Sequence, residues 1–313
     1  MLQVRVITPT HLTADVVERL RDEHGATNIT VQPGTAIEPA GDVVIVDVTR
    51  ERGNAVVEDL VEFRLDELGS ISLVTLEAST SVGARRAEEA AAGHELDALL
   101  WESLEENSRA DARGSITFAA LMMLAALIAS IGVLLDSPVL IIGAMIVGPE
   151  YGPLMALAIA VYRRRGYALT ALGTLAWGLA AAVATAATAT ALFRAIGEIP
   201  SGFNSSDRFF TAFVTQPNVL SAVVALAAGI AGTIALAQGR ESSLAGVLIS
   251  VTTIPAAAAL GVDIVFGDWG DAGGAALQLT INLVAIAVAS VATLAVHDRA
   301  WRRLGGGELS VRP

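Results

Sequence analysis

The sequence predicts an α-helical polytopic membrane protein with an N-terminal α+β domain of the ferredoxin-like class, and three observations support this prediction. Of the 313 residues, 53% are hydrophobic and 17% are charged, whereas soluble chains average about 25% charged residues. Six apolar stretches can each reach the roughly 20 residues that a membrane helix needs. The charge is uneven, because residues 1–115 hold 10 Arg and 22 acidic residues while residues 116–313 hold 10 of each. An acidic water-soluble head therefore precedes a neutral membrane body.

The composition excludes several classes of protein. A nucleic-acid binder needs a basic surface, whereas the head is acidic, so this class is excluded. The apolar membrane body excludes a single soluble domain and a disordered chain. The chain has no Cys and its four His are scattered, so neither a metal nor another cofactor is expected. Because the sequence shows no candidate Ser/His/Asp catalytic triad, we expect no enzymatic activity. The first residues, MLQVRVITPT, lack the pattern of a cleaved signal peptide.

Residues 1–77 predict a cytoplasmic βαββαβ domain. Segments that are rich in β-branched residues or alternate between apolar and polar predict four strands, at 3–8, 28–31, 43–46 and 71–76. Two amphipathic segments predict helices, at 14–24 and 54–68. The second strand is expected to end at Pro33-Gly34, and the second helix to bury its Val and Leu residues up to Leu68. This order is that of a ferredoxin-like sandwich. By fold analogy alone, such a domain is a ligand sensor or an assembly module.

Residues 78–115 form an acidic connector, within which residues 83–108 predict one helix. Its narrow apolar stripe consists of Leu96, Leu99, Leu100 and Leu104. The stripe packs either on the head or against another subunit, and the sequence leaves both alternatives open. We expect a homo-oligomer.

Residues 116–297 predict a membrane domain of six spans, at 116–135, 139–161, 167–193, 218–237, 244–266 and 273–296. With the head inside the cell, nine Arg residues fall in inside segments and only Arg194 and Arg208 fall outside. This asymmetry agrees with the positive-inside rule. The chain is therefore expected in the cell membrane, with the N-terminus and the tail at 298–313 both cytoplasmic.

The second span is interrupted by the hexapeptide Gly148-Pro149-Glu150-Tyr151-Gly152-Pro153. Two Pro and two Gly within six residues break a helix, and irregular backbone at membrane depth is tolerated only inside protein or beside a wet cavity. An ionised carboxylate there costs about 2.5–3.5 kcal/mol on insertion scales. The combination predicts an ion or proton pathway at Glu150. The alternative is a structural kink in which Glu150 bonds only to backbone.

A second interruption lies in the fifth span, where Thr252, Thr253 and Pro255 follow one another closely. The Thr hydroxyls either satisfy carbonyls that Pro leaves free or face Glu150 and bind an ion. Residues 124–129 recur in similar form at 226–231, and Pro153 falls on Pro255 at the same offset. Spans one to three are thus candidates to repeat as spans four to six in a 3+3 inverted repeat with broken helices, as in many secondary transporters.

Two further polar residues complete the predicted substrate or ion pathway. Gln278 and Asn282 lie four positions apart on the sixth span, so they share one helix face.

Several long segments resemble the family of integral membrane proteins known as domain of unknown function 389. They are Ala126–Pro153, Val223–Gly232, Gly246–Pro255 and Thr280–Asn282, and the resemblance covers about residues 110–297. The acidic head and the GPEYGP form resemble one branch of the family. Many relatives lack the acid in this break and have Pro-Pro where this chain has Pro255-Ala256, so the resemblance implies an architecture and no role for Glu150 or assigned activity.

Two functional hypotheses follow from these patterns. The first is a transporter or channel for a small solute or ion, with the head as a regulatory or assembly domain. The second is a membrane-anchored ligand sensor or oligomeric scaffold without transport. Broken helices favour the first, because an anchor has no need of them. The expected partners are the lipid bilayer, a small solute or ion and further copies of the chain, and no nucleic acid.

Overall fold

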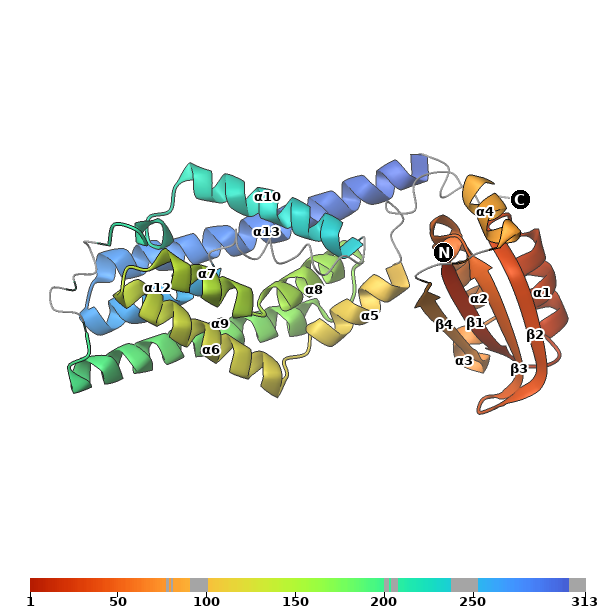
Figure 1. Cartoon of the computed structure of the whole chain (residues 1–313), viewed down its shortest axis with the longest axis horizontal. Coiled ribbons are helices and arrows are strands. Elements are labelled where there is room, and N and C mark those ends of the chain that lie inside the picture. The colour runs from red at the N-terminus through yellow and green to blue at the C-terminus, as the bar shows by residue number, and fades with distance from the viewer. Residues whose placement is uncertain are drawn as a thin grey trace. The chain divides into compact units, whose positions relative to one another are not determined.

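The computed structural model describes residues 1–76, 79, 81–90, 101–199, 203, 208–237 and 253–303. It divides the chain into two compact units, Met1–Leu104 with His297–Pro313, and Glu105–Val296 (Figure 1). We call them the head unit and the helical unit.

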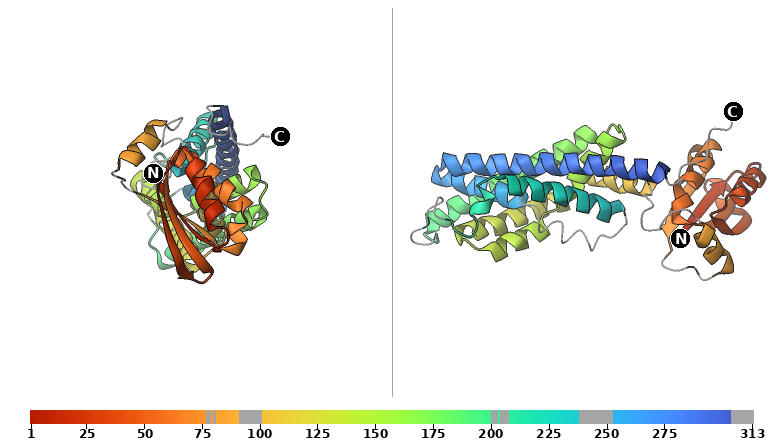
Figure 2. Two further views of the ribbon diagram at one scale, coloured as in Figure 1. Left: turned by 90° about the vertical axis from the view of Figure 1, so that its right-hand side faces the viewer. Right: turned by 90° about the horizontal axis from the view of Figure 1, so that it is seen from above.

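The head unit is built on a four-stranded antiparallel sheet with the strand order β2-β3-β1-β4. Its elements are β1 (Leu2–Thr8), α1 (Thr13–Asp22), β2 (Ala26–Ile37), β3 (Ala40–Val48), the 3-10 helix η1 (Arg50–Arg52), α2 (Gly53–Glu62), α3 (Leu65–Leu68) and β4 (Ser70–Thr75). Alternate residues of β1 and β3, such as Val4 and Val46, meet Leu20 of α1 and Leu60 of α2 in one buried core. Figure 2 shows the sheet and its helices from two further sides. The alternation that predicted β1 therefore reflects one buried sheet face.

Strand β2 is longer than predicted. It does not end at Pro33-Gly34 but continues to Ile37 and pairs with β3 as far as Ala40. Gly34 adopts a positive φ of 62°, and the register shifts between Gln32 and Ala36. A bulge thus absorbs the two turn residues, which the sequence pattern alone represents as a strand end.

The helix predicted over residues 54–68 is broken. Arg64 has a left-handed backbone conformation with φ of 56°, so α2 ends at Glu62 and α3 forms a separate short turn. Val57, Leu60 and Leu65 are buried as predicted, whereas Val61 and Leu68 are 42% and 46% exposed. Val61 lies within α2 before the break, and Leu68 is the last residue of α3. The prediction of an inward position was therefore wrong at these two residues.

The predicted connector helix is present in two described pieces. Helix α4 (Val82–Ala90) belongs to the head unit, and α5 (Trp101–Asp111) leads into the helical unit. Residues 91–100, with Leu96, Leu99 and Leu100 of the predicted stripe, lie outside the described residues.

The described helices of the helical unit are α6 (Ile116–Leu134), α7 (Pro138–Val147), α8 (Tyr151–Tyr162), α9 (Ala168–Ile196), the 3-10 helix η4 (Ala212–Val214), α10 (Val219–Ala237), α12 (Thr253–Phe266) and α13 (Trp269–Arg303). Helix α13 belongs to this unit as far as Val296. Four of these, α6, α9, α10 and α13, are long and apolar enough to cross a membrane. The pair α7 and α8 counts as a fifth span if the two helices are taken together. Helix α12 is apolar but has only 14 residues, and residues 238–252, the first part of the predicted fifth span, are not described.

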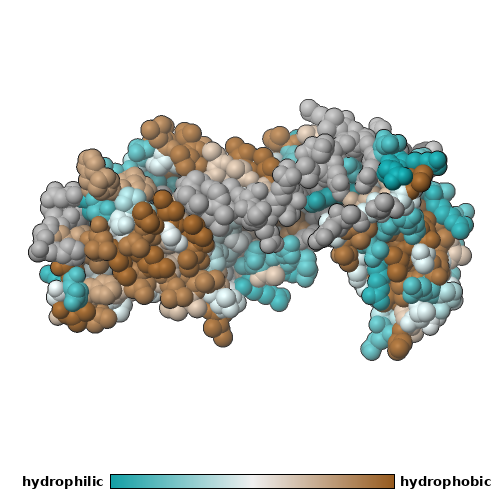
Figure 3. All heavy atoms as spheres, in the orientation of Figure 1, coloured by the Kyte–Doolittle hydropathy of each residue, from teal (hydrophilic) through white to brown (hydrophobic). Residues whose placement is uncertain are grey.

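Apolar side chains cover much of the surface of the helical unit (Figure 3). Large hydrophobic residues such as Ile116, Val139, Leu169 and Val219 are each more than two-thirds exposed. A water-soluble protein rarely exposes apolar area on this scale, whereas a lipid-facing surface requires it. The unit is therefore that of a membrane protein with several candidate spans.

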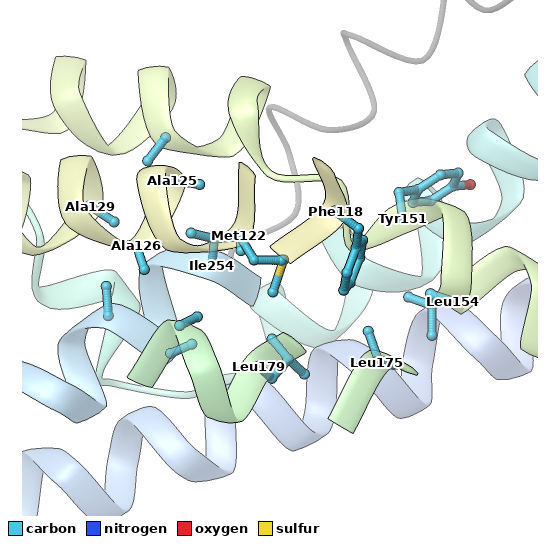
Figure 4. Close-up of a cluster of buried hydrophobic side chains, with 14 of the residues drawn as sticks. Phe118, Met122, Ala125, Ala126, Ala129, Tyr151, Leu154, Leu175, Leu179 and Ile254 are labelled. Carbon is cyan, nitrogen blue, oxygen red and sulfur yellow. The ribbon is translucent and has the colours of Figure 1, made fainter. Parts of the chain in front are cut away.

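Small residues bring the helices of this unit close together. A Cβ added to Gly261 of α12 would lie 2.6 Å from the Val183 carbonyl oxygen of α9, and one added to Gly229 of α10 would lie 2.8 Å from the Ala289 Cβ of α13. The core between them combines Ala with a few large residues, including Met122, Leu179 and Ile254 (Figure 4). Such close backbone contact is typical of packing between membrane helices.

Candidate functional site

The predicted interruption of the second span separates α7 from α8. The two helices are bent by 53° at the break. Gly148 is extended, with φ of −68° and ψ of 126°, and its N–H closes α7 on the Ala144 carbonyl. The helix resumes at Glu150, whose carbonyl accepts the first bond of α8 from the Leu154 N–H at 3.3 Å. Pro149 has no N–H to continue the ladder of α7, which is the physical cause of the break.

Glu150 lies at this break and is buried, with 3% of its surface exposed. Its Oε1 accepts a hydrogen bond of 2.5 Å from the hydroxyl of Thr253, the first residue of α12. Its Oε2 is also buried and has no hydrogen-bond partner among the described residues. The structure thus brings together two predicted site residues from the two interruptions.

Gly148 makes room for this carboxylate. A Cβ at this position would overlap Oε2 of Glu150 and would lie 2.7 Å from Cγ1 of Ile254. The absence of a side chain therefore lets the carboxyl group lie between the break and the start of α12.

The chemistry available to Glu150 follows from its surroundings. A buried ionised carboxylate with an unpaired oxygen is several kcal/mol less stable than in water, by order of magnitude. The group gains most from binding a proton or a small cation at Oε2, since Thr253 already occupies Oε1. A carboxyl that binds and releases such an ion is the basis of ion relays inside membranes.

Tyr151 and Gly152 do not face α12, as Glu150 does, but lie against α10 and α5. The Tyr151 ring lies against Gly232 of α10, where an added Cβ would overlap the phenol, and its hydroxyl has no partner in the described part of the chain. A Cβ on Gly152 would lie 3.2 Å from Cγ of Asp111 of α5. Pro153, like Tyr151, is buried (Figure 4 shows the Tyr151 side chain).

Gln278 and Asn282 share one face of α13, as predicted. Both are buried, and Nε2 of Gln278 donates to Oδ1 of Asn282 at 3.1 Å. The Ser221 hydroxyl of α10 donates to Oε1 of Gln278 at 3.2 Å. These bonds connect α13 to α10, so the pair forms a second buried polar cluster.

Two predicted residues remain from the second interruption. Pro255 is the third residue of α12 and is buried. Thr252, which was expected to face Glu150, lies outside the described residues.

An ion pair that the sequence did not indicate lies in the same unit. Nη2 of Arg208 is 2.9 Å from Oδ1 of Asp263 and 3.2 Å from Oδ2 of Asp271. Asp263, inside the predicted fifth span 244–266, lies within α12 and is fully buried. The available signal was its position as a lone charge inside the apolar segment ALGVDIVF.

Within the described ranges, no group of three or more His, Asp or Glu side chains could hold a metal ion.

The family comparison covers the region in which these residues lie. Residues 145–288 match the family described as "Domain of unknown function (DUF389)". The chain carries a DUF389 domain. The domain starts within α7 and ends within α13, and it includes Glu150, Thr253, Asp263 and Gln278. The resemblance seen in the sequence is confirmed for this segment. No match was found among curated proteins or among solved structures.

Proposed function

We propose that this protein is a transporter or channel for a small solute or ion, and that Glu150 is the proton or cation site of its pathway. One observation supports this above all others. A broken apolar helix pair holds a buried carboxylate that has one oxygen bonded to Thr253 at the start of α12 and the other oxygen without a hydrogen-bond partner among the described residues. A passive anchor or an oligomeric scaffold requires neither the break nor the unpaired carboxylate.

In this proposal, the carboxylate alternates between an empty and a loaded state. Thr253 holds Oε1 in place, while Oε2 takes up the proton or cation. Because loading neutralises a charge at a buried position, the two states differ in their preferred hydration. The half-helices α7 and α8 then shift against α12 as the site faces one side of the membrane or the other.

We further propose that the membrane domain has six spans arranged as a 3+3 inverted repeat. Helices α6 and α10 each have 19 residues, and α9 and α13 are the two longest helices, with 29 and 35 residues. Helices α8 and α12 both carry a Pro as their third residue, Pro153 and Pro255. Because three is an odd number of spans, the second repeat enters the membrane from the opposite side to the first. In transporters of this architecture, the binding site lies near the middle of the membrane, where the broken helices of the two repeats meet.

The proposed arrangement has both termini in the cytoplasm of the cell. The Arg asymmetry of the sequence supports this topology. The head unit, which we take to be a ferredoxin-like domain, then serves regulation or assembly of a homo-oligomer. We propose no enzymatic activity, no cofactor and no nucleic-acid partner.

The proposal is tested by proton flux in proteoliposomes that contain an entrapped pH-sensitive dye. The purified chain should produce a flux above that of empty vesicles under an imposed K⁺ diffusion potential. Glu150→Gln should abolish this flux, because the amide keeps the shape of the side chain but cannot bind a proton. Glu198→Gln, at an exposed position of the same unit, is the matched control and should retain the flux.

Two results would count against the proposal. Equal flux in wild type and empty vesicles would favour the sensor or scaffold hypothesis. Undiminished flux in Glu150→Gln would remove Glu150 from the pathway.

A further inference from the structure

The ion pair of Arg208 and Asp263 lies at the opposite end of α12 from Glu150. Helix α12 begins at Thr253, which bonds to Glu150, and Asp263 follows ten residues later. At a rise of 1.5 Å per residue, about 15 Å of helix separates the two positions. Residues 253–259 and 261–263 are all buried, so one enclosed helix joins the two carboxylates.

Arg208 and the two carboxylates that it contacts, Asp263 and Asp271, carry one positive and two negative charges when ionised. The Arg208 guanidinium is shared between Asp263 and Asp271, and Oδ2 of Asp263 is buried with no hydrogen-bond partner among the described residues. Among the described residues, two other charged groups lie near this end of α12. Asp268 lies in the turn before α13, where its Oδ1 accepts from the Asp271 N–H at 3.2 Å, and exposed Arg194 of α9 donates to the Val265 carbonyl at 3.0 Å.

The residues that follow Arg208 are held by the turn between α6 and α7. Oδ2 of Asp136 accepts from the N–H groups of Phe209 and Phe210, both at 3.0 Å. Oδ1 of Asp136 accepts from the N–H and the hydroxyl of Thr211, both at 2.8 Å. Residues 208–216, which we call the closing segment, are therefore bonded to the α6–α7 turn, to α12 and to α13.

We propose that Asp263 is a second proton-binding group of the pathway, with Arg208 as its internal counter-ion, and that proton uptake releases the closing segment from α12. This inference rests on the proposed function. A proton from water adds to a carboxylate oxygen of Asp263, the ion pair between Asp263 and Arg208 is lost, and the contact of Arg208 with Asp271 remains. No covalent bond of the protein is broken. A proton is the fitting ligand because the guanidinium already fills the position that a metal cation would need.

The test uses thiol accessibility, which needs no knowledge of the transported solute. The chain contains no Cys, so Val214→Cys places a single thiol in the closing segment at a fully buried position. The protein is reconstituted in lipid nanodiscs, where both faces are accessible, and reacted with a membrane-impermeant maleimide at constant pH. The thiol should react slowly in the otherwise unchanged chain, and at least about tenfold faster when Asp263→Asn is added, since breaking a buried ion pair is strongly destabilising.

Two further variants separate release of the segment from general unfolding. Asp268→Asn removes the same charge from the neighbouring turn without touching Arg208, and it should leave the rate of the Val214→Cys thiol unchanged. Arg208→Gln combined with Asp263→Asn removes both charges of the pair, and it should react as fast as Asp263→Asn alone. All proteins are first checked for an unchanged elution volume.

Thiols react more slowly with maleimide at lower pH, so the rate of the Val214→Cys thiol is divided by that of an exposed thiol, Glu198→Cys, at each pH. This ratio should rise as the pH falls. Asp263→Asn should abolish the pH dependence of the ratio. Slow, pH-independent reaction in every variant would overturn the inference, and so would equal acceleration by Asp268→Asn. The labelling result does not depend on flux, so it can stand when the flux experiment on Glu150 fails.

Discussion

The hydroxyl of Thr253 donates to Oε1 of Glu150 at 2.5 Å and joins residues that are 103 positions apart in the chain. Each residue lies at the start of a helix, α8 for Glu150 and α12 for Thr253. The break between α7 and α8 and the start of α12 are thus parts of one site. This contact is the reason to treat the break as more than a local kink.

Replacing Thr253 tests the contribution of that hydrogen bond. Thr253→Val keeps the side-chain shape but removes the hydroxyl, which leaves Oε1 of the buried Glu150 without its donor. We expect a loss of about 1–3 kcal/mol in the free energy of unfolding, measured by thermal unfolding in detergent. Thr253→Ser keeps a hydroxyl and should lose less. Equal losses in the two variants would show that the methyl group, and not the bond, matters.

Replacing Gly148 tests the space reserved for the carboxylate. Gly148→Ala adds a Cβ that overlaps Oε2 of Glu150 and approaches Ile254, so we expect destabilisation of about 1–3 kcal/mol. Gly143→Ala, within α7 and with nothing within 4 Å of its added Cβ, is the control and should be neutral or stabilising. Thermal unfolding of the two variants side by side decides the point. If Gly148→Ala were as stable as Gly143→Ala, the close packing around Glu150 would be refuted.

The ion pairs of Glu105 predict a pH-dependent stability. Burial alone would raise the pKa of the Glu105 carboxyl, but bonds of 2.7 Å from Arg163 and Arg165 outweigh it and hold this pKa below its ordinary value. The stabilisation is therefore complete above the ordinary pKa of 4.5 and is lost as the pH falls through the lower value in the folded protein.

Glu105→Gln should accordingly destabilise the chain at pH 7 by about 1–2 kcal/mol, a figure reduced for the partial exposure of Arg165. The difference from wild type should shrink in acid. Glu106→Gln, at an exposed neighbouring position, serves as control in the same unfolding series. A difference that persists unchanged in acid would contradict the assignment to ionised Glu105.

Single Cys residues test the proposed topology, because the chain has none of its own. In intact cells, an impermeant maleimide should label Glu198→Cys and Asp268→Cys, which lie at turns proposed to face outward. It should label Arg164→Cys, in the turn between α8 and α9, only after the cells are opened. The reverse pattern would show that the head is outside.

The sequence predicted those features that depend on local chemistry. Pro149 lacks the N–H that a continuing helix needs, and this is a local property, so the interruption and its carboxylate were evident from the hexapeptide. The spacing of Gln278 and Asn282 fixed their shared helix face in the same way. Long-range features were less accessible. The buried pairing of Arg208 with Asp263 joins residues 55 positions apart, and the pattern of either segment is equally compatible with an exposed charge. The left-handed turn at Arg64 also has no local signature.

The central claim is that buried Glu150 takes up and releases a proton, and infrared difference spectroscopy of the reconstituted protein measures this most directly. Lowering the pH should produce the C=O band of a protonated carboxylic acid in an apolar setting, with a shift on exchange into D₂O. We predict that Glu150→Gln removes one such band and that Glu198→Gln leaves it in place. Identical difference spectra for wild type and Glu150→Gln would contradict the claim, because the carboxyl would then not exchange protons with water.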